Sequence, residues 1–100
     1  MQVQNRNNLQ WYDVPHDPGS LVINSGLALQ FLTNDYFKAT NHRVLINKEE
    51  RISIPFFFEP SYDFKMNPKF FNKSVKNNNK IINYEVFLKK SLKKFIEYKR

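Results

Sequence analysis

The sequence predicts a mainly β domain that is closed by a C-terminal amphipathic helix. Short apolar runs separated by turn residues occupy the first sixty positions, a pattern typical of a sandwich or barrel. After Pro60 the chain becomes polar and basic, and apolar residues at helical spacing return only from Tyr84. A length of 100 residues allows one domain at most. A hydrophobic content of 41%, with 16% aromatics, argues for a folded chain rather than a disordered one.

The expected strands follow one another at short intervals. Runs of apolar, aromatic and β-branched residues occupy 9–14, 20–24, 42–47 and 51–58. The intervening turns are rich in Pro, Gly, Asn and Asp and occupy 15–19, 24–26 and 33–35. Residues 27–33 fit either a helical turn or a strand. The two clearest strands, 42–47 and 51–58, are joined by Lys48-Glu49-Glu50.

The C-terminal helix is expected from Tyr84 to about Tyr98, with Asn83 as its N-cap. Its apolar stripe comprises Tyr84, Phe87, Leu88, Leu92, Phe95 and Ile96, and most of its lysines fall on the other side. Such a helix is expected to dock on the β core; the alternative is a basic helix that lies on a membrane. The most apolar run, Leu21–Leu32, is too short and too polar to span a membrane.

Charge is concentrated in the last third of the chain. The formal net charge is +7, and residues 64–100 carry 11 Lys and Arg against 2 Asp and Glu. This bias indicates either a solvated lysine face or attraction to an anionic partner such as nucleic acid. Nucleic acid is the less favoured partner, because the lysines have little aromatic interleaving and no zinc motif accompanies them. The lack of cysteine excludes disulfides, and a cytoplasmic location is expected.

A predicted antiparallel hairpin carries the residues that could bind a metal ion or a ligand. Strands 42–47 and 51–58 are close enough in sequence to pair. If Ile46 lies opposite Arg51, one face carries His42, Val44, Ile46, Arg51, Ser53 and Pro55. The other face carries Arg43, Leu45, Ile52, Ile54 and Phe56, and is apolar enough for a core. The first face is mostly apolar with a few polar groups, which is typical of a pocket wall.

Three side chains on that face suit the binding of a metal and a dicarboxylate. The imidazole of His42 is an ordinary ligand for ferrous iron in sites of two His and one carboxylate. Arg51 offers a planar charged fork for a carboxylate, and Ser53 can donate a hydroxyl hydrogen bond to the same group. Each of these residues taken alone is more often structural than functional, and periodicity alone does not single them out.

The sequence resembles the C-terminal half of the isopenicillin-N-synthase-like branch of iron/2-oxoglutarate dioxygenases. The resemblance covers about residues 2–60. It rests on Trp11-Tyr12-Asp13-Val14-Pro15, Pro18-Gly19-Ser20-Leu21-Val22-Ile23-Asn24 with Gly26, Thr33-Asn34, Phe37-Lys38, His42-Arg43-Val44 and Arg51-Ile52-Ser53-Ile54-Pro55-Phe56-Phe57. Two positions depart from the family pattern, with Leu27 where the family has Asp and Asp35 where it has Gly.

The resemblance implies a fold and a site. Residues 1–60 would be half of a double-stranded β-helix, or jelly roll, followed by an irregular basic segment over 61–82 and a helix over 83–100. His42 would be the distal iron ligand, and Arg51 and Ser53 would bind the far carboxylate of 2-oxoglutarate. The implied cofactors are Fe(2+) and 2-oxoglutarate, with ascorbate in the ethylene-forming members.

The family's other two iron ligands come from a His-x-Asp motif upstream of the matched region. This chain has two His, and His16 is followed directly by Asp17, so it does not form that motif. We therefore expect a fragment of an oxidoreductase that oxidises a small organic substrate, inactive until an upstream segment completes it. The alternative is a non-enzymatic remnant that binds nucleic acid or another anionic partner through its basic C-terminal tail.

Overall fold

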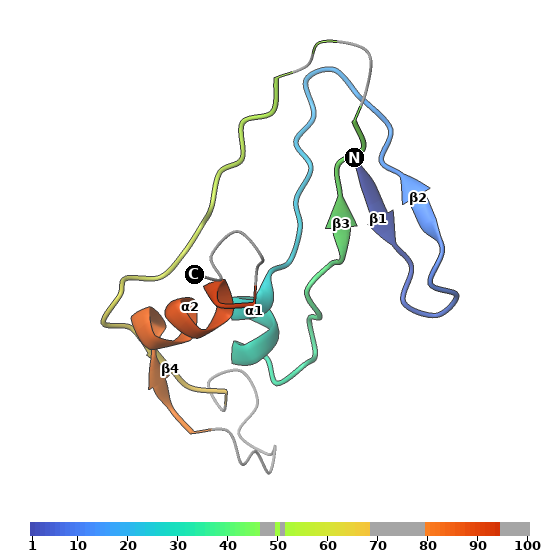
Figure 1. The fold of residues 1–100 in the computed structure, drawn as a ribbon. Coiled ribbons are helices and arrows are strands. Elements are labelled where there is room, and N and C mark those ends of the chain that lie inside the picture. Colours follow the sequence, from blue (N-terminus) through green and yellow to red (C-terminus); the bar gives the residue numbers. More distant parts are fainter. Residues whose placement is uncertain (47–49, 51, 69–79, 95–100) are drawn as a thin grey trace.

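The computed structural model describes all residues except 47–49, 51, 69–79 and 95–100. The described residues form two small antiparallel sheets and two helices (Figure 1). In chain order the elements are β1 (Gln2–Gln4), β2 (Trp11–Asp13), α1 (Leu27–Leu32), β3 (His42–Arg43), β4 (Lys65–Met66), β5 (Ile82–Asn83) and α2 (Tyr84–Leu92). In the part of the chain that the structure describes, no helix is both long and apolar enough to cross a membrane.

The first sheet has the order β2-β1-β3, so the N-terminal strand is the central one. Both pairs are antiparallel, and a network of side chains on one face joins all three strands. The Arg43 guanidinium carbon lies 4.2 Å from the centre of the Trp11 ring, and Arg43 Nε donates to Gln2 Oε1 at 2.9 Å. Gln2 Nε2 in turn donates to Asp13 Oδ1 at 3.1 Å. The network supplements the backbone bonds of strands that are only two or three residues long.

Part of the strand prediction is wrong for the described residues. A strand forms within 9–14, as β2, but 20–24, 44–46 and 52–58 are not strands. The expected hairpin is not formed, because β3 ends at Arg43 and pairs with β1 instead. Residues 52–60, yellow-green in Figure 1, run down the side of the molecule away from β3.

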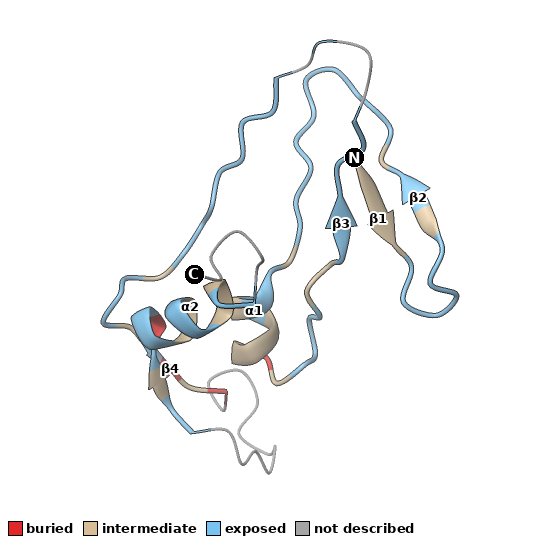
Figure 2. Ribbon diagram, viewed as in Figure 1, coloured by how far each residue is buried: buried red, intermediate tan, exposed pale blue. Residues whose placement is uncertain are grey.

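The physical reason for these missing strands is the lack of a second layer. In the segment 52–58, Ile52, Ile54, Phe56 and Phe58 are each between 86% and 95% exposed. Figure 2 shows the same exposure as a continuous pale-blue ribbon. Burial of one such side chain stabilises a fold by about 1.5–3 kcal/mol. Without that gain a two-stranded hairpin is marginal in water, and the described residues offer no layer to provide it.

The ambiguous segment 27–33 forms helix α1 over Leu27–Leu32, and the turn predicted from Thr33 is confirmed. Asn34 and Asp35 both have positive φ angles, of 50° and 64°, a region that favours glycine. Asp is among the residues that tolerate this conformation, and Gln30 Nε2 donates to Asp35 Oδ1 at 2.7 Å. The turn therefore forms although Asp35 replaces the Gly of the family pattern.

The buried side chain of Thr33 stabilises this turn. It is 6% exposed, its Oγ1 donates to the Leu29 carbonyl oxygen at 2.7 Å, and the same oxygen accepts from the Phe37 N–H at 3.1 Å. The Thr33 hydroxyl thus links the last turn of α1 to the turn that follows it.

The C-terminal residues form a second small unit in which α2 lies against the β4-β5 pair. Met66, Pro68 and Tyr84 are buried there. Helix α2 begins at the predicted residue, but the Asn83 side chain makes no capping hydrogen bond. Instead the N–H groups of Tyr84 and Glu85 donate to the carbonyl oxygens of residues 64 and 62, at 2.9 and 3.0 Å. Main-chain carbonyls therefore satisfy the helix start, and the part of the predicted helix beyond Lys94 lies outside the described residues.

We predict that Thr33→Val lowers the free energy of unfolding by about 1–3 kcal/mol, because the Phe37 N–H loses its acceptor inside the turn. Denaturant titration followed by circular dichroism measures this difference. Thr33→Ser keeps the hydroxyl and is the matched control, expected to retain most of the stability. A Thr33→Val protein as stable as the unmodified chain would contradict the assigned role.

A second prediction concerns alkaline pH. Burial raises the pKa of the Tyr84 hydroxyl above its ordinary value, and a hydrogen bond to Glu59 raises this pKa further. Above about pH 10 the unfolded chain releases this proton while the folded chain retains it, so stability falls as pH rises from there. Tyr84→Phe removes the effect, and its unfolding free energy should decline less steeply between about pH 10 and 11. Parallel slopes for the two proteins would exclude Tyr84 as the cause.

Candidate functional site

His42 is the predicted site residue that the structure places most clearly. Strand β3 carries it opposite Val3 of β1, and Val3 lies opposite Tyr12 of β2. Directly opposed residues share a face, so His42 lies on the face away from Arg43 and Trp11. Its side chain is exposed. The sheet thus fixes the backbone of His42 and leaves its ring accessible.

The hydrogen bond of the His42 ring determines which nitrogen is available. Nδ1 lies 3.0 Å from the carbonyl oxygen of Thr40, which can only accept. A neutral imidazole in this contact carries its proton on Nδ1 and keeps a lone pair on Nε2. Histidines that bind metals commonly have this arrangement, in which a backbone carbonyl fixes the tautomer. His42 therefore fits the role of one metal ligand through Nε2.

The other two predicted residues are not brought to His42 by the described contacts. Ser53 is exposed on the unpaired segment 52–58 and makes no hydrogen bond to another described residue. Arg51 lies outside the described residues. The pairing that would set Pro55 opposite His42 is not formed, so the common face stays a prediction.

The metal donors in the described part of the chain do not complete a site. No group of three or more His, Cys, Asp or Glu side chains there is arranged to hold an ion. His16, the other histidine, is exposed in the irregular segment before the turn at Pro18-Gly19. The residues present fit one ligand of an iron site and no more.

The central strand β1 and the contacts of Arg43 are features that the sequence did not predict. Arg43 was expected on an apolar face of a hairpin, but it lies over Trp11 and bonds to Gln2. The alternation of Gln2, Val3 and Gln4 is a weak strand signal that could have indicated β1. This network positions β3, and therefore His42, from the opposite face of the sheet.

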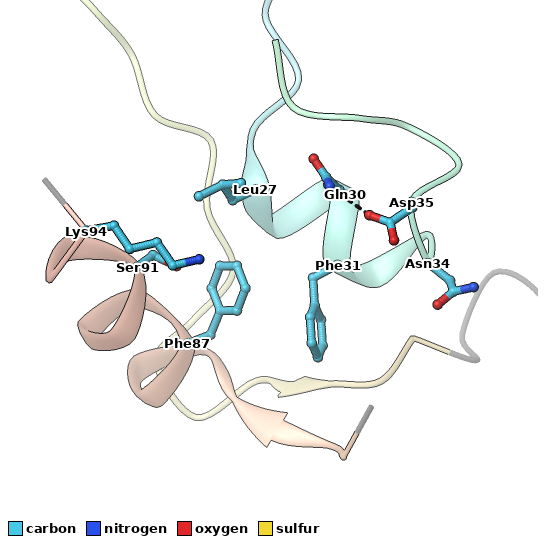
Figure 3. Close-up of a pocket in the computed structure, with 8 residues that line it drawn as sticks. All are labelled: Leu27, Gln30, Phe31, Asn34, Asp35, Phe87, Ser91 and Lys94. Atoms are coloured by element: carbon cyan, nitrogen blue, oxygen red, sulfur yellow. Dashed lines mark hydrogen bonds between the residues drawn. The ribbon is translucent and has the colours of Figure 1, made fainter. Parts of the chain in front are cut away.

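A cavity of about 160 Å³ lies between α1 and α2 (Figure 3). It is lined by Leu27, Gln30, Phe31, Asn34, Asp35, Phe87, Ser91 and Lys94. The Phe31 and Phe87 rings lie 5.4 Å apart between their centres, so this is where the two units pack. None of the predicted site residues lines the cavity, and it is smaller than the roughly 300 Å³ usual for organic ligands.

Comparison with known proteins confirms the resemblance. The family model described as the 2OG-Fe(II) oxygenase superfamily matches residues 1–60. The 1-aminocyclopropane-1-carboxylate oxidase homolog 2 of Arabidopsis thaliana is 48% identical over 61 residues, covering 59% of this chain and 16% of the relative. Isopenicillin N synthase of Streptomyces griseus is 41% identical over 58 residues, covering 58% of this chain and 18% of the relative.

Gibberellin 3-beta-dioxygenase 1 of Arabidopsis thaliana is 41% identical over 64 residues, covering 63% of this chain and 18% of the relative. The chain thus spans less than a fifth of the length of these relatives. No solved structure matches it. Because the family model covers the entire segment from β1 through residue 60, the chain belongs to the 2OG-Fe(II) oxygenase superfamily.

Proposed function

We propose that residues 1–60 are the part of an iron- and 2-oxoglutarate-dependent oxidoreductase that supplies one iron ligand and the cosubstrate clamp. The observation that carries the proposal is the His42 ring, which uses Nδ1 on the Thr40 carbonyl and keeps Nε2 for a metal. Both His42 and Thr40 lie within residues 1–60, the segment that the family model matches. The fold proposed for the complete domain is the jelly roll of the superfamily.

Each residue has a distinct part in this proposal. His42 would hold Fe(2+) through Nε2, and the bound ion would supply the oxidising chemistry. Arg51 would bind the far carboxylate of 2-oxoglutarate through two parallel hydrogen bonds, and the Ser53 hydroxyl would donate a third. Together they would orient the cosubstrate, whose oxidative decarboxylation is coupled to the oxidation of a small organic substrate.

We further propose that this chain is inactive by itself and is completed by a segment that carries two more iron ligands. Three protein ligands are usual in such sites, and the described residues hold no such group. The aligned region of the relatives is likewise only a small share of their length. An in-frame His-x-Asp sequence in the DNA upstream would support this view.

The second candidate is a binding protein for an anionic partner. Lys90, Lys93 and Lys94 are exposed on and after α2, whereas Lys89 bonds to Glu85 at 2.6 Å. A phosphate-rich partner would release counterions on binding, so its affinity would fall steeply with salt. Titration of single-stranded DNA at two salt concentrations separates the candidates. Affinity well above that of a control of equal charge would favour this second function.

The proposed roles predict a ranked loss of activity in a chimera. In gibberellin 3-beta-dioxygenase 1, the aligned 64 residues are replaced by those of this chain. We expect 2-oxoglutarate-dependent turnover to persist and His42→Ala to lower it by about 100-fold or more. Arg51→Lys, which loses the planar fork, should raise the KM for 2-oxoglutarate by about tenfold. Ser53→Ala should raise it by a few-fold.

The matched control for this series is His16→Ala, which removes the other histidine from an exposed irregular segment and should leave turnover unchanged. Activity that survives His42→Ala would overturn the ligand role. A KM for 2-oxoglutarate that is insensitive to Arg51→Lys would overturn the clamp.

A further prediction concerns the chain alone. We expect anaerobic calorimetry to detect no stoichiometric Fe(2+) binding tighter than about 10 μM, because one imidazole is a weak site. The His42→Ala protein is the control and should give the same trace. Tight binding at a ratio of one ion per chain, lost in His42→Ala, would show that the chain is complete as it stands.

A further inference from the structure

The contact that orients the His42 ring depends on an irregular segment. Its acceptor is the carbonyl oxygen of Thr40, which belongs to residues 38–41, the stretch between the turn after α1 and β3. These residues form neither helix nor strand, so no regular ladder of hydrogen bonds holds their peptide groups. The direction of the Thr40 carbonyl must therefore be set by groups elsewhere in the chain.

Ser25 bonds to this segment at both ends of residues 38–40. Its Oγ donates to the carbonyl oxygen of Lys38 at 2.7 Å, and its own carbonyl oxygen accepts from the Thr40 N–H at 3.1 Å. The hydroxyl oxygens of Ser25 and Thr40 lie 3.5 Å apart, and both residues are half-buried. Ser25 thus holds the chain directly before the carbonyl oxygen that contacts His42.

Other residues hold the remaining backbone groups of the segment. The N–H of Ala39 donates to Gln30 Oε1 at 2.7 Å, and the carbonyl oxygen of Ala39 accepts from Arg6 Nη2. The carbonyl oxygen of Asn41 accepts from the Gln4 N–H at 2.9 Å. The segment is therefore bonded to α1 on one side, and to β1 and the residues after it on the other (Figure 1).

The Ser25 hydroxyl serves this segment alone in the part of the chain that the structure describes. Gln30, by contrast, also donates to Asp35 and so takes part in the turn after α1. The N-cap of α1 is Gly26, so Ser25 does not cap that helix. Loss of the Ser25 hydroxyl therefore acts on residues 38–40 rather than on α1 or its turn.

We propose that Ser25 is a positioning residue for the metal-ligand role of His42. It holds residues 38–40 so that the Thr40 carbonyl keeps the ring proton on Nδ1 and leaves Nε2 available. The inference rests on the proposed function, in which Nε2 binds the metal. Ser25 acts through Thr40 and has no direct part in binding the metal or the cosubstrate.

The first test measures which nitrogen of the neutral His42 ring carries the proton. Nitrogen-15 NMR of the full chain distinguishes the two forms at about pH 8.5, where an ordinary histidine is uncharged. We expect the Nδ1–H form to predominate in the unmodified chain. Ser25→Ala removes a hydrogen bond and should lower the ratio of the Nδ1–H to the Nε2–H form about fivefold. Ser25→Thr keeps the hydroxyl and should restore the ratio.

The matched control for Ser25→Ala is Ser20→Ala. Ser20 Oγ also donates to a backbone carbonyl oxygen at 2.7 Å, that of Asp17, across the exposed Pro18-Gly19 turn. Loss of this hydroxyl should leave the His42 ratio unchanged. If Ser25→Ala leaves the ratio unchanged as well, or if both variants lower it equally, the positioning role is overturned.

A second measurement distinguishes positioning from general loosening of the sheet. Trp11 is the one tryptophan of the chain, and its ring lies against Arg43, on the face of the sheet away from His42. Its fluorescence should be the same in the unmodified chain and in Ser25→Ala. A His42 ratio that falls only together with a shift of the Trp11 emission would overturn the positioning role in favour of a structural one.

The second test measures metal affinity in the chimera with gibberellin 3-beta-dioxygenase 1. Co(2+), followed by its visible absorption, stands in for Fe(2+). We expect Ser25→Ala to weaken Co(2+) binding about fivefold and Ser25→Thr to restore it. The KM for 2-oxoglutarate at saturating Fe(2+) should not change, because the proposed clamp consists of Arg51 and Ser53.

The two tests separate the positioning role from the proposed function. If the NMR ratio changes as expected but neither Ser25→Ala nor His42→Ala weakens Co(2+) binding, the proposed function is overturned and the orientation of the ring by Ser25 stands. If His42→Ala weakens Co(2+) binding and Ser25→Ala does not, the proposed function stands and the positioning role is overturned.

Discussion

The three residues of β1 are the constraint on which the first sixty positions depend. Strand β1 lies between β2 and β3, so it joins segments that are about thirty residues apart in sequence. The side chain of Gln2 also connects the two outer strands, because it accepts a hydrogen bond from Arg43 of β3 and donates one to Asp13 of β2. Without β1, neither the place of β3 nor the orientation of His42 would be defined.

The rest of the matched segment shows how strongly strand formation depends on context. Ile52, Ile54 and Phe56 have the residue types and the alternation of a strand, yet they form none in this chain. A strand is stable when its backbone is paired and one face is covered, and the described residues provide neither here.

The features that could be predicted from the sequence are local. The turn at Thr33-Asn34-Asp35 depends on nearby residues and forms where expected. Helix α2 also starts at the expected residue, where the local apolar spacing begins. Family membership was also readable, because the motifs from Trp11 to Phe57 are specific in order and spacing. For the candidate site, the metal-ligand role of His42 stays a prediction, and the contact of its Nδ1 with the Thr40 carbonyl leaves Nε2 available for that role.

The features that could not be predicted involve partners distant in sequence. The alternation around His42 specified which residues share a face but not which strand lies beside β3, and β1 rather than 51–58 takes that place. The interaction of Arg43 with Trp11 follows from this pairing and was therefore missed as well. Asn83 shows the same principle, since the carbonyls of residues 62 and 64, rather than its own side chain, accept from the first N–H groups of α2.

That capping arrangement has a consequence for the order of folding. The first N–H groups of α2 have acceptors only once the chain from Tyr62 to Phe64 lies against them. The start of the helix is therefore coupled to the position of residues 62–64, which lead into β4. Because the Phe31–Phe87 ring contact bridges this unit to α1, loosening of the C-terminal unit would also remove a packing contact from α1.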